Sequence, residues 1–336
     1  MKVLIATGIY PPQIGGPATY AKNLAETFVK MNHVVSVKYF GFEHKLPTIV
    51  RHFWFFMKSV YAVWKSDFIL ALDAFSVGTA MVLASKIFHK KIVIRIGGDF
   101  LWETYINRTG KTILLSDFYK IPIEDFNLKE KIIFKITKWT LCNASVVVFS
   151  TNWQKEIFLA PYGLSSKTVR IIENFYGPKE SGVKDCSNEE VKNFVGGVRD
   201  LKWKKGLVDS AFLNASKFDK SIHLDKETCG YNCFFNKIKN SYAVILVSLS
   251  DISPNMILDA VRCNKPFILT RENGLDRLSS LAILVDPQNE KDITEKILWL
   301  AKRDNYLIQK KKIEEFDFVH SWEEIAREFI NIFEQK

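Results

Sequence analysis

Short runs of consecutive apolar residues alternate along the first half of the chain with longer amphipathic segments. The runs are rich in Val and Ile and do not alternate with polar residues, as expected for strands buried on both faces of a parallel sheet. They cover residues 2–7, 34–40, 68–73, 91–97, 144–150 and 168–173. Helical periodicity marks the segments 17–31, 50–65, 76–88, 129–142 and 152–160. This alternation predicts a doubly wound α/β domain over residues 1–175.

A polar stretch with Gly and Pro follows over residues 176–190, and its composition predicts a linker or hinge. Apolar runs then resume and predict a second, smaller α/β domain over 191–318. These runs cover residues 194–198, 221–225, 243–248, 266–270 and 281–286. Two open α/β sheets that face each other would bind a ligand in the cleft at the carboxyl ends of their strands.

The last segment, 319–336, has the pattern of a capped helix. Ser321 is the expected N-cap, and Glu324 three residues later completes a capping box. The helix has an apolar stripe that needs a surface to cover, which we expect on the N-terminal domain. The stripe consists of Ile325, Phe329, Ile330 and Phe333.

Composition narrows the class of protein. The 336 residues suit two domains, and 47% hydrophobic residues argue against disorder. The net charge of +10 favours acidic partners. No nucleic-acid-binding motif is present, so we expect no nucleic-acid partner. No apolar run approaches the roughly 18–20 residues that span a bilayer, and no signal peptide is apparent, so we expect a cytoplasmic protein, free or at a membrane surface.

The five cysteines do not form a recognisable framework. Cys229 and Cys233 form C-x3-C, but no second Cys or His pair lies nearby to complete a zinc site. We therefore expect no metal, and we expect reduced thiols in a cytoplasmic protein.

Two motifs lie at strand ends in the first domain. Gly15 and Gly16 open a helix after the first strand, where backbone N–H groups and the helix N-terminus attract phosphate. A tight turn is an equal alternative, and the spacing is not G-x-G-x-x-G. Asp99 follows a buried strand, where it can accept a substrate hydroxyl at the rim of the cleft or cap the next turn.

The second domain contains a basic cluster after its first strand. Arg199 and Lys204, with Lys205 adjacent, can clamp a diphosphate, Arg as a fork and Lys as a point charge. The alternative is a solvated basic face.

A second motif of this domain begins a helix after the strand at 243–248. Ser253 is the expected N-cap, Pro254 the first helical residue and Asn255 the next. Asp259 lies about a turn and a half into that helix, and Asp251 lies in the loop before it. Both carboxylates could accept hydroxyl groups of a ligand.

These motifs, in this order, resemble the GT-B glycosyltransferases of family 4 over nearly the whole chain. "IYPPQIGGPATY" is similar to the family's glycine loop, "IRIGGDFLWE" to its acceptor-side segment, and Arg199-x4-Lys204 to its donor clamp. Asp251-x7-Asp259 stands where the family has E-x7-E. "AVRCNKPFILTRENG", "LVDP" and the "SW" near the C-terminus also resemble it.

The resemblance implies a nucleotide-sugar donor, such as a UDP- or GDP-hexose, and retaining transfer without a cofactor. Asp259 would hold the ribose, Asp251 would lie near the donor hexose, and Asp99 near the acceptor. Arg199 with Lys204 or Lys205 would neutralise the departing diphosphate, while Gly15 and Gly16 would pack beside the phosphates. The acceptor would be a glycan or a lipid-linked molecule in cell-surface polysaccharide or glycolipid synthesis.

The chain departs from the family pattern in the second domain. Aspartates stand here in place of the family's two glutamates, and their shorter side chains reach less far. Between Ser221 and Ser241 the family has a further βα unit that helps to frame the nucleotide base, and this chain has only "IHLDKETCGYNCFFNKIKN". A non-catalytic relative that binds a nucleotide or sugar, or partners an active transferase, is therefore the alternative. A Rossmann oxidoreductase is a further alternative, against which the missing G-x-G-x-x-G argues.

The segment 51–65 combines bulky aromatic residues with Arg51, His52, Lys58 and Lys65. A helix of this kind can lie in a membrane interface. Alternatively, it packs against the sheet with its basic residues at the solvent edge.

Overall fold

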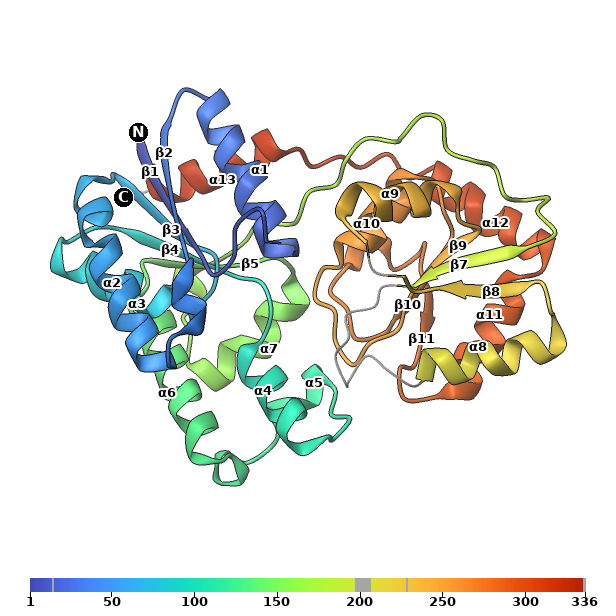
Figure 1. Cartoon of the computed structure of the whole chain (residues 1–336), viewed down its shortest axis with the longest axis horizontal. Coiled ribbons are helices and arrows are strands. Elements are labelled where there is room, and N and C mark those ends of the chain that lie inside the picture. Colours follow the sequence, from blue (N-terminus) through green and yellow to red (C-terminus); the bar gives the residue numbers. More distant parts are fainter. Residues whose placement is uncertain (14, 197–206, 228, 335–336) are drawn as a thin grey trace. The chain divides into compact units, whose positions relative to one another are not determined.

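The computed structural model of the chain describes residues 1–13, 15–196, 207–227 and 229–334. Its contacts divide it into two units (Figure 1). Unit 1 comprises Met1–Tyr105, Tyr119–Asn174 and Ser321–Lys336, and unit 2 comprises Ile106–Phe118 and Phe175–His320. Each unit is a parallel sheet with helices, so the predicted doubly wound α/β architecture is confirmed.

Unit 1 contains a six-stranded sheet in the order β2-β1-β3-β4-β5-β6, with every described pair parallel. All residues of the central strands β3 and β4 are buried, whereas the edge strand β2 is partly exposed. This difference explains why the central strands read as continuous apolar runs. The strands are β1 (Lys2–Thr7), β2 (Val34–Tyr39), β3 (Phe68–Ala71), β4 (Ile92–Ile96), β5 (Val146–Phe149) and β6 (Val169–Ile171).

The chain reverses direction across this sheet after β2, since β3 lies on the other side of β1. Right-handed crossovers then place α1 on one face and the helices after β2 on the other. The helices of this unit are α1 (Gly16–Lys30), α2 (Thr48–Lys65), α3 (Gly78–Ile87), α6 (Leu128–Asn143), α7 (Asn152–Tyr162) and α13 (Trp322–Glu334), together with the part of α4 (Phe100–Thr109) up to Tyr105. Helix α13 packs beside α1, and α3 packs between α2 and α6.

The C-terminal helix α13 begins with the predicted capping box. The backbone N–H of Glu324 donates to Ser321 Oγ at 3.2 Å, and the backbone N–H of Ser321 donates to Glu324 Oε2 at 2.6 Å. Ile325, Ala326 and Phe329 are buried, and the Trp322 ring meets the Tyr20 ring of α1 edge to face. The expected apolar stripe therefore covers part of unit 1.

A buried charge lies under α1. Arg95 of β4 stacks its guanidinium 3.9 Å from the centroid of the Tyr20 ring and donates to Asn174 Oδ1. The planar guanidinium suits both interactions, because it stacks on rings and keeps its in-plane donors.

Unit 2 contains a five-stranded parallel sheet in the order β11-β10-β9-β7-β8. If β7 to β11 are renumbered 1 to 5 and the sheet is read from β8, the order is 2-1-3-4-5. The first five strands of unit 1 have the same order. Its strands are β7 (Lys192–Gly196), β8 (Ile222–Asp225), β9 (Ala243–Leu246), β10 (Phe267–Thr270) and β11 (Ile283–Val285). Its helices are α5 (Leu115–Phe118), α8 (Leu207–Phe218), α9 (Tyr231–Asn240), α10 (Asn255–Arg262), α11 (Glu290–Leu300) and α12 (Arg303–Glu314).

The sheet of unit 2 separates two apolar clusters. One contains Phe194, Phe212 and Ile297 and lies where α8 packs against α11. The other contains Ile257, Leu258 and Phe267 and lies where α9 packs against α10. Between β8 and β9 the described chain has α9 alone, which fits the predicted shortening of this domain.

Candidate functional site

A cavity of about 190 Å³ lies at the carboxyl end of the unit 1 sheet. Its walls come from the segments that follow β1, β3 and β4, and include Gly8, Asp73 and Asp99. Strand order reverses between β1 and β3, and such a reversal leaves a crevice because the two crossover helices leave toward opposite faces. The topology thus places this cavity where open α/β sheets bind their ligands.

Asp99 is buried in this cavity wall and is the residue before the first turn of α4. Its Oδ1 accepts from the backbone N–H groups of Leu101 and Trp102, each at 3.0 Å. Asp99 therefore caps the helix, as the sequence allowed. Its Oδ2 accepts from Tyr119 Oη at 2.5 Å. With two lone-pair directions per oxygen, Oδ2 can accept one more hydrogen bond.

Tyr119 and Tyr162 support the Asp99 carboxylate. Their hydroxyl oxygens are 2.8 Å apart, and because Tyr119 donates its proton to Asp99, Tyr162 donates to Tyr119. Burial raises the pKa of Asp99, and the bonds from Tyr119, Trp102 and Leu101 oppose that rise. Burial and the Asp99 charge raise the pKa of Tyr119 well above its ordinary value, so this hydroxyl stays a donor.

Asp73 is a second carboxyl in the cavity wall and is not among the predicted site residues. Its Oδ1 accepts from the backbone N–H groups of Ser76 at 2.6 Å and Val77 at 3.0 Å, and burial raises its pKa. A Cβ at Gly78 would lie 2.3 Å from the Asp73 carbonyl oxygen, so this loop requires glycine. The available signal was its place at the end of the run 68–73, the same signal that identified Asp99.

The glycine motif lies close to this cavity. Gly15 is the N-cap of α1, Gly16 is its first residue, and Pro17 is part of the cavity wall. A proline in the first helical turn is favourable because the N–H it lacks would have no partner within the helix.

The strand order of unit 2 reverses between β7 and β9. β7 ends at Gly196, and the predicted basic cluster of Arg199, Lys204 and Lys205 lies outside the described residues. The loop after β9 carries Asp251, whose backbone N–H donates to the Glu272 carbonyl at 2.9 Å. Asp251 is half-buried and lies at the carboxyl end of the sheet, as predicted.

The start of α10 corrects one detail of the prediction. The helix begins at Asn255 with Pro254 as its N-cap, and no side chain accepts from the first turn at that position. The expected assignment of Ser253 as N-cap and Pro254 as first helical residue is therefore wrong by one position. The extended backbone of Pro254 (ψ 112°) explains the shift, because an N-cap residue lies outside the helical region. The helix ends as predicted, with Asn264 in the left-handed region.

Asp259 is buried on α10 and bonded within its own unit. Its Oδ1 accepts from Arg262 Nη1 at 2.9 Å and from Tyr231 Oη at 3.2 Å. Arg262 also donates to Glu180 Oε1 at 2.5 Å, and its guanidinium lies 4.9 Å from the centroid of the Phe235 ring. Burial raises the pKa of Asp259 to about 6, while Arg262 and Tyr231 oppose that rise.

This raised pKa predicts a pH dependence of stability. The folded protein holds a proton on Asp259 up to about pH 6, whereas the unfolded chain releases it near pH 4. The folded state binds more protons in that window, so the free energy of unfolding falls as pH rises from 4 to 6. Relative to Asp259→Asn, wild-type protein should lose about 2–3 kcal/mol between pH 4 and pH 7 in urea unfolding. If the free energy of unfolding of wild type and of Asp259→Asn changed with pH in the same way, Asp259 would not be the source of the pH dependence.

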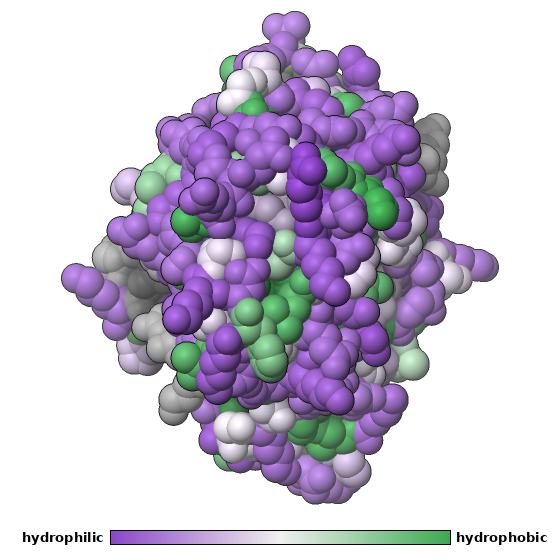
Figure 2. Space-filling view, turned by 90° about the vertical axis from the view of Figure 1, so that its right-hand side faces the viewer, coloured by the Kyte–Doolittle hydropathy of each residue, from purple (hydrophilic) through white to green (hydrophobic). Residues whose placement is uncertain are grey.

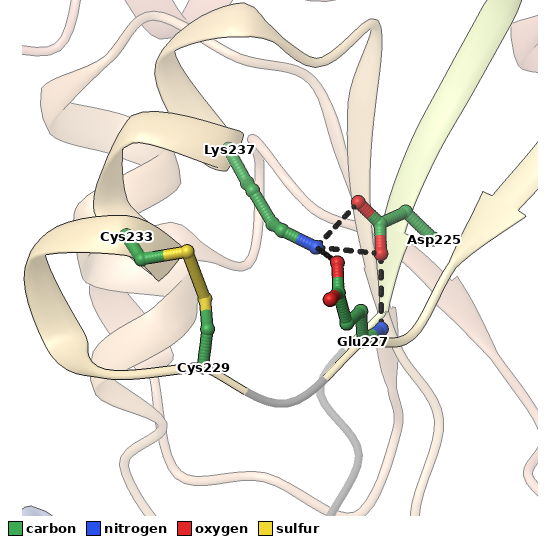
Figure 3. Close-up of a disulfide and its surroundings, with 5 residues drawn as sticks. All are labelled: Asp225, Glu227, Cys229, Cys233 and Lys237. Atoms are coloured by element: carbon green, nitrogen blue, oxygen red, sulfur yellow. Dashed lines mark hydrogen bonds and ion pairs between the residues drawn. A yellow bond between two sulfur atoms is a disulfide. The ribbon is translucent and has the colours of Figure 1, made fainter.

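A disulfide joins Cys229 and Cys233 at the start of α9, which corrects the expectation of reduced thiols at these two positions (Figure 3). Their Cα atoms are 6.0 Å apart, within bridging distance. Later in α9, Lys237 Nζ bonds to Asp225 at 2.9 Å and to Glu227 at 2.8 Å (Figure 3). The disulfide and the ion pairs fix the helix that carries Tyr231.

Across the described ranges, no group of three or more His, Cys, Asp or Glu side chains is arranged to hold a metal ion. Within the same part of the chain, no helix is both long enough and apolar enough to span a membrane.

Comparison with known proteins relates the chain to others by structure alone. No protein-family model matches it, and no curated protein matches it in sequence. Sucrose-phosphate synthase from Thermosynechococcus elongatus is similar with a TM-score of 0.71 and 11% identity, over 99% of this chain and 98% of that one. WaaG, a glycosyltransferase involved in lipopolysaccharide biosynthesis, is similar with a TM-score of 0.68 and 11% identity, over 99% of this chain and 100% of that one.

A third neighbour shows that the fold is not restricted to transferases. A putative UDP-N-acetylglucosamine 2-epimerase from Listeria monocytogenes is similar with a TM-score of 0.59 and 13% identity, over 100% of this chain and 97% of that one. Identities this low relate folds and not activities. The chain has the GT-B fold.

Proposed function

We propose that the chain is a retaining glycosyltransferase that moves a hexose from a nucleotide-sugar to a glycan or lipid-linked acceptor in cell-surface polysaccharide or glycolipid synthesis. The observation that carries this proposal is the cavity of unit 1, which has two carboxyl groups in its wall at the topological switch point. Carboxylate oxygens accept hydrogen bonds, and a sugar presents several hydroxyl donors at once.

Unit 1 would hold the acceptor. The remaining lone pair of Asp99 Oδ2 would accept the reacting hydroxyl, and Tyr119 would keep the carboxylate in place. Asp73 would accept a second hydroxyl from its loop after β3. Carboxylates that are held in place before the substrate binds lower the entropic part of the activation barrier of the transfer.

Unit 2 would hold the donor at the carboxyl end of its sheet. Asp251 would lie near the hexose and Asp259 near the ribose, with the start of α10 directed at the diphosphate. Arg199, with Lys204 or Lys205, would neutralise charge on the departing nucleotide, so no metal cofactor is needed. Gly15 and Gly16 would pack beside the phosphates, and Ser253, Pro254 and Asn255 would line the donor site.

One observation favours a second candidate, a non-catalytic protein that binds a nucleotide or sugar or partners an active transferase. Asp259 is buried and its Oδ1 already accepts from Arg262 and Tyr231, so only Oδ2 would remain for a ribose hydroxyl. The shortened sheet of unit 2 is consistent with either candidate.

Calorimetric titration with UDP, GDP and their hexose conjugates tests the donor site. We expect one nucleotide to bind with a Kd below millimolar, and we expect Arg199→Ala and Asp259→Ala to weaken it about tenfold or more. Lys291→Ala, which removes an exposed lysine of α11, is the matched control and should leave binding unchanged. Absence of binding at millimolar nucleotide would overturn the transferase, and binding without transfer to any acceptor would favour the second candidate.

We propose that the protein acts in the cytoplasm at the inner face of the cell membrane, where a lipid-linked acceptor would be within reach.

A further inference from the structure

Helix α2 buries one of its faces in unit 1 and exposes apolar residues on the opposite one. Phe55, Ser59 and Val63 are fully buried. We call the exposed apolar residues of α2 the aromatic stripe, and several of them are more than half exposed. The aromatic stripe consists of Val50, Phe53, Trp54, Met57, Tyr61 and Trp64.

The spacing of the aromatic stripe makes it a single face. Its members recur at intervals of three and four residues, and at 3.6 residues per turn they occupy an arc of about 100°. Isolated exposed apolar residues are normal on protein surfaces, but a continuous row of this size marks a binding surface. By contrast, the face drawn in Figure 2 is mostly hydrophilic, and its hydrophobic residues form small groups.

The charged residues beside the aromatic stripe are all cations. Arg51, Lys58 and Lys65 lie along one edge of it, and Lys65 Nζ lies 4.5 Å from the centroid of the Tyr61 ring. The sequence has no Asp or Glu from position 44 to 66, or from 74 to 98, which includes the neighbouring helix α3. Glu43, before α2, is fully buried and paired with Lys58 at 2.8 Å.

Helix α3 packs against α2 and adds exposed groups of the same two kinds. Leu83 and Ile87 are exposed aliphatic residues one helical turn apart, and Lys86 lies exposed beside Ile87. Unit 1 therefore combines apolar and cationic groups on two adjacent helices.

We propose that the aromatic stripe of α2 binds the interface of an anionic lipid bilayer. Tryptophan and tyrosine rings partition into the headgroup region, because one end of each ring system is apolar and the other forms hydrogen bonds. Lys65 at the edge of the aromatic stripe and Lys86 of α3 would meet anionic headgroups, each adding to the attraction near the surface, while Lys58 is paired with Glu43. A protein partner would need a matching acidic rim, whereas an anionic bilayer supplies negative charge along the whole helix.

The proposal goes beyond sugar transfer and does not depend on it, so its test uses lipid alone. Full-length protein is sedimented with vesicles of phosphatidylcholine, with or without about one-third phosphatidylglycerol. We expect binding to the anionic vesicles, weakened by salt, and little binding to the neutral ones. Brominated lipid should quench part of the tryptophan fluorescence of the bound protein.

Trp54→Ser/Tyr61→Ser/Trp64→Ser should lower binding roughly tenfold or more and remove most of that quenching. Leu213→Ser/Phe218→Ser, which removes two exposed apolar residues of α8, is the matched control and should bind like wild type. No binding to anionic vesicles, equal binding to both vesicle types, or an unaffected triple variant would overturn the proposal. So would a wild-type dimer that the triple substitution dissociates, because the aromatic stripe would then bind a second copy.

Discussion

Replacing Asp99 by asparagine is expected to lower kcat for nucleotide release from the donor by about 10²–10³-fold, with little change in KM. The asparagine carbonyl can still accept from Leu101 and Trp102, so the cap of α4 survives. The amide nitrogen would replace Oδ2 and would donate where the carboxylate accepts from Tyr119 and from the acceptor hydroxyl. Steady-state kinetics with the donor identified by titration measures this effect.

Two further variants separate the role of Asp99 from its surroundings. Tyr119→Phe removes the bond to Oδ2 and should raise the apparent pKa of Asp99 in the pH profile, because a hydrogen bond to the charged form is lost. Asp209→Asn removes a surface carboxylate that pairs with Lys226 and should leave kcat unchanged. A folded Asp99→Asn protein with wild-type kcat would show that Asp99 is only a helix cap.

Truncating Phe329 to alanine is expected to destabilise unit 1 by about 3–5 kcal/mol. Phe329 is fully buried on α13, where it covers unit 1 together with Ile325 and Ala326. Its loss leaves a cavity that the capped helix cannot readily close, since Trp322 and the capping box hold the start of α13 in place. Calorimetry is the suitable measurement, because chains with two domains often unfold in separate transitions.

The matched control for this prediction is Phe218→Ala. Phe218 ends α8 and is 79% exposed, so its truncation should change stability by no more than about 0.5 kcal/mol. Equal effects of the two substitutions, or a wild-type melting profile for Phe329→Ala, would show that α13 contributes little to the fold.

The strands and most helices were predictable, because parallel strands buried on both faces leave continuous apolar runs. The runs at 68–73 and 91–97 became β3 and β4, whose residues are all buried. The capping box of Ser321 and Glu324 was equally predictable, since its two partners lie three residues apart in the sequence. Local signals of this kind do not need tertiary context.

The parts of the site that were not predictable depend on contacts between distant segments. Tyr119 bonds to Asp99 from 20 residues away and Tyr162 bonds to Tyr119 from 43 residues away, and no local pattern indicates that the three converge. The pairing of Asp259 with Tyr231 is of the same kind, since 28 residues separate them. Asp73 is different, because its position at the end of the apolar run 68–73 is a local signal of the kind that identified Asp99. That run predicted only a strand.

Buried polar groups were also missed by pattern alone. The motif "IRIGG" reads as a strand end, but it does not indicate that Arg95 stacks on Tyr20. The Cys229–Cys233 disulfide was not expected, because cysteine spacing by itself does not determine whether two thiols are joined.

The central claim is that this chain transfers sugar from a nucleotide-sugar donor. The most direct measurement is proton NMR of the protein with each UDP- and GDP-hexose in turn, following nucleotide release and the anomeric configuration of the product. We predict release from one donor, a product with the anomeric configuration of the donor, and a rate at least about a hundredfold lower for Asp99→Asn. No release from any of these donors would contradict the claim, whereas release that Asp99→Asn leaves unchanged would show that Asp99 is only a helix cap.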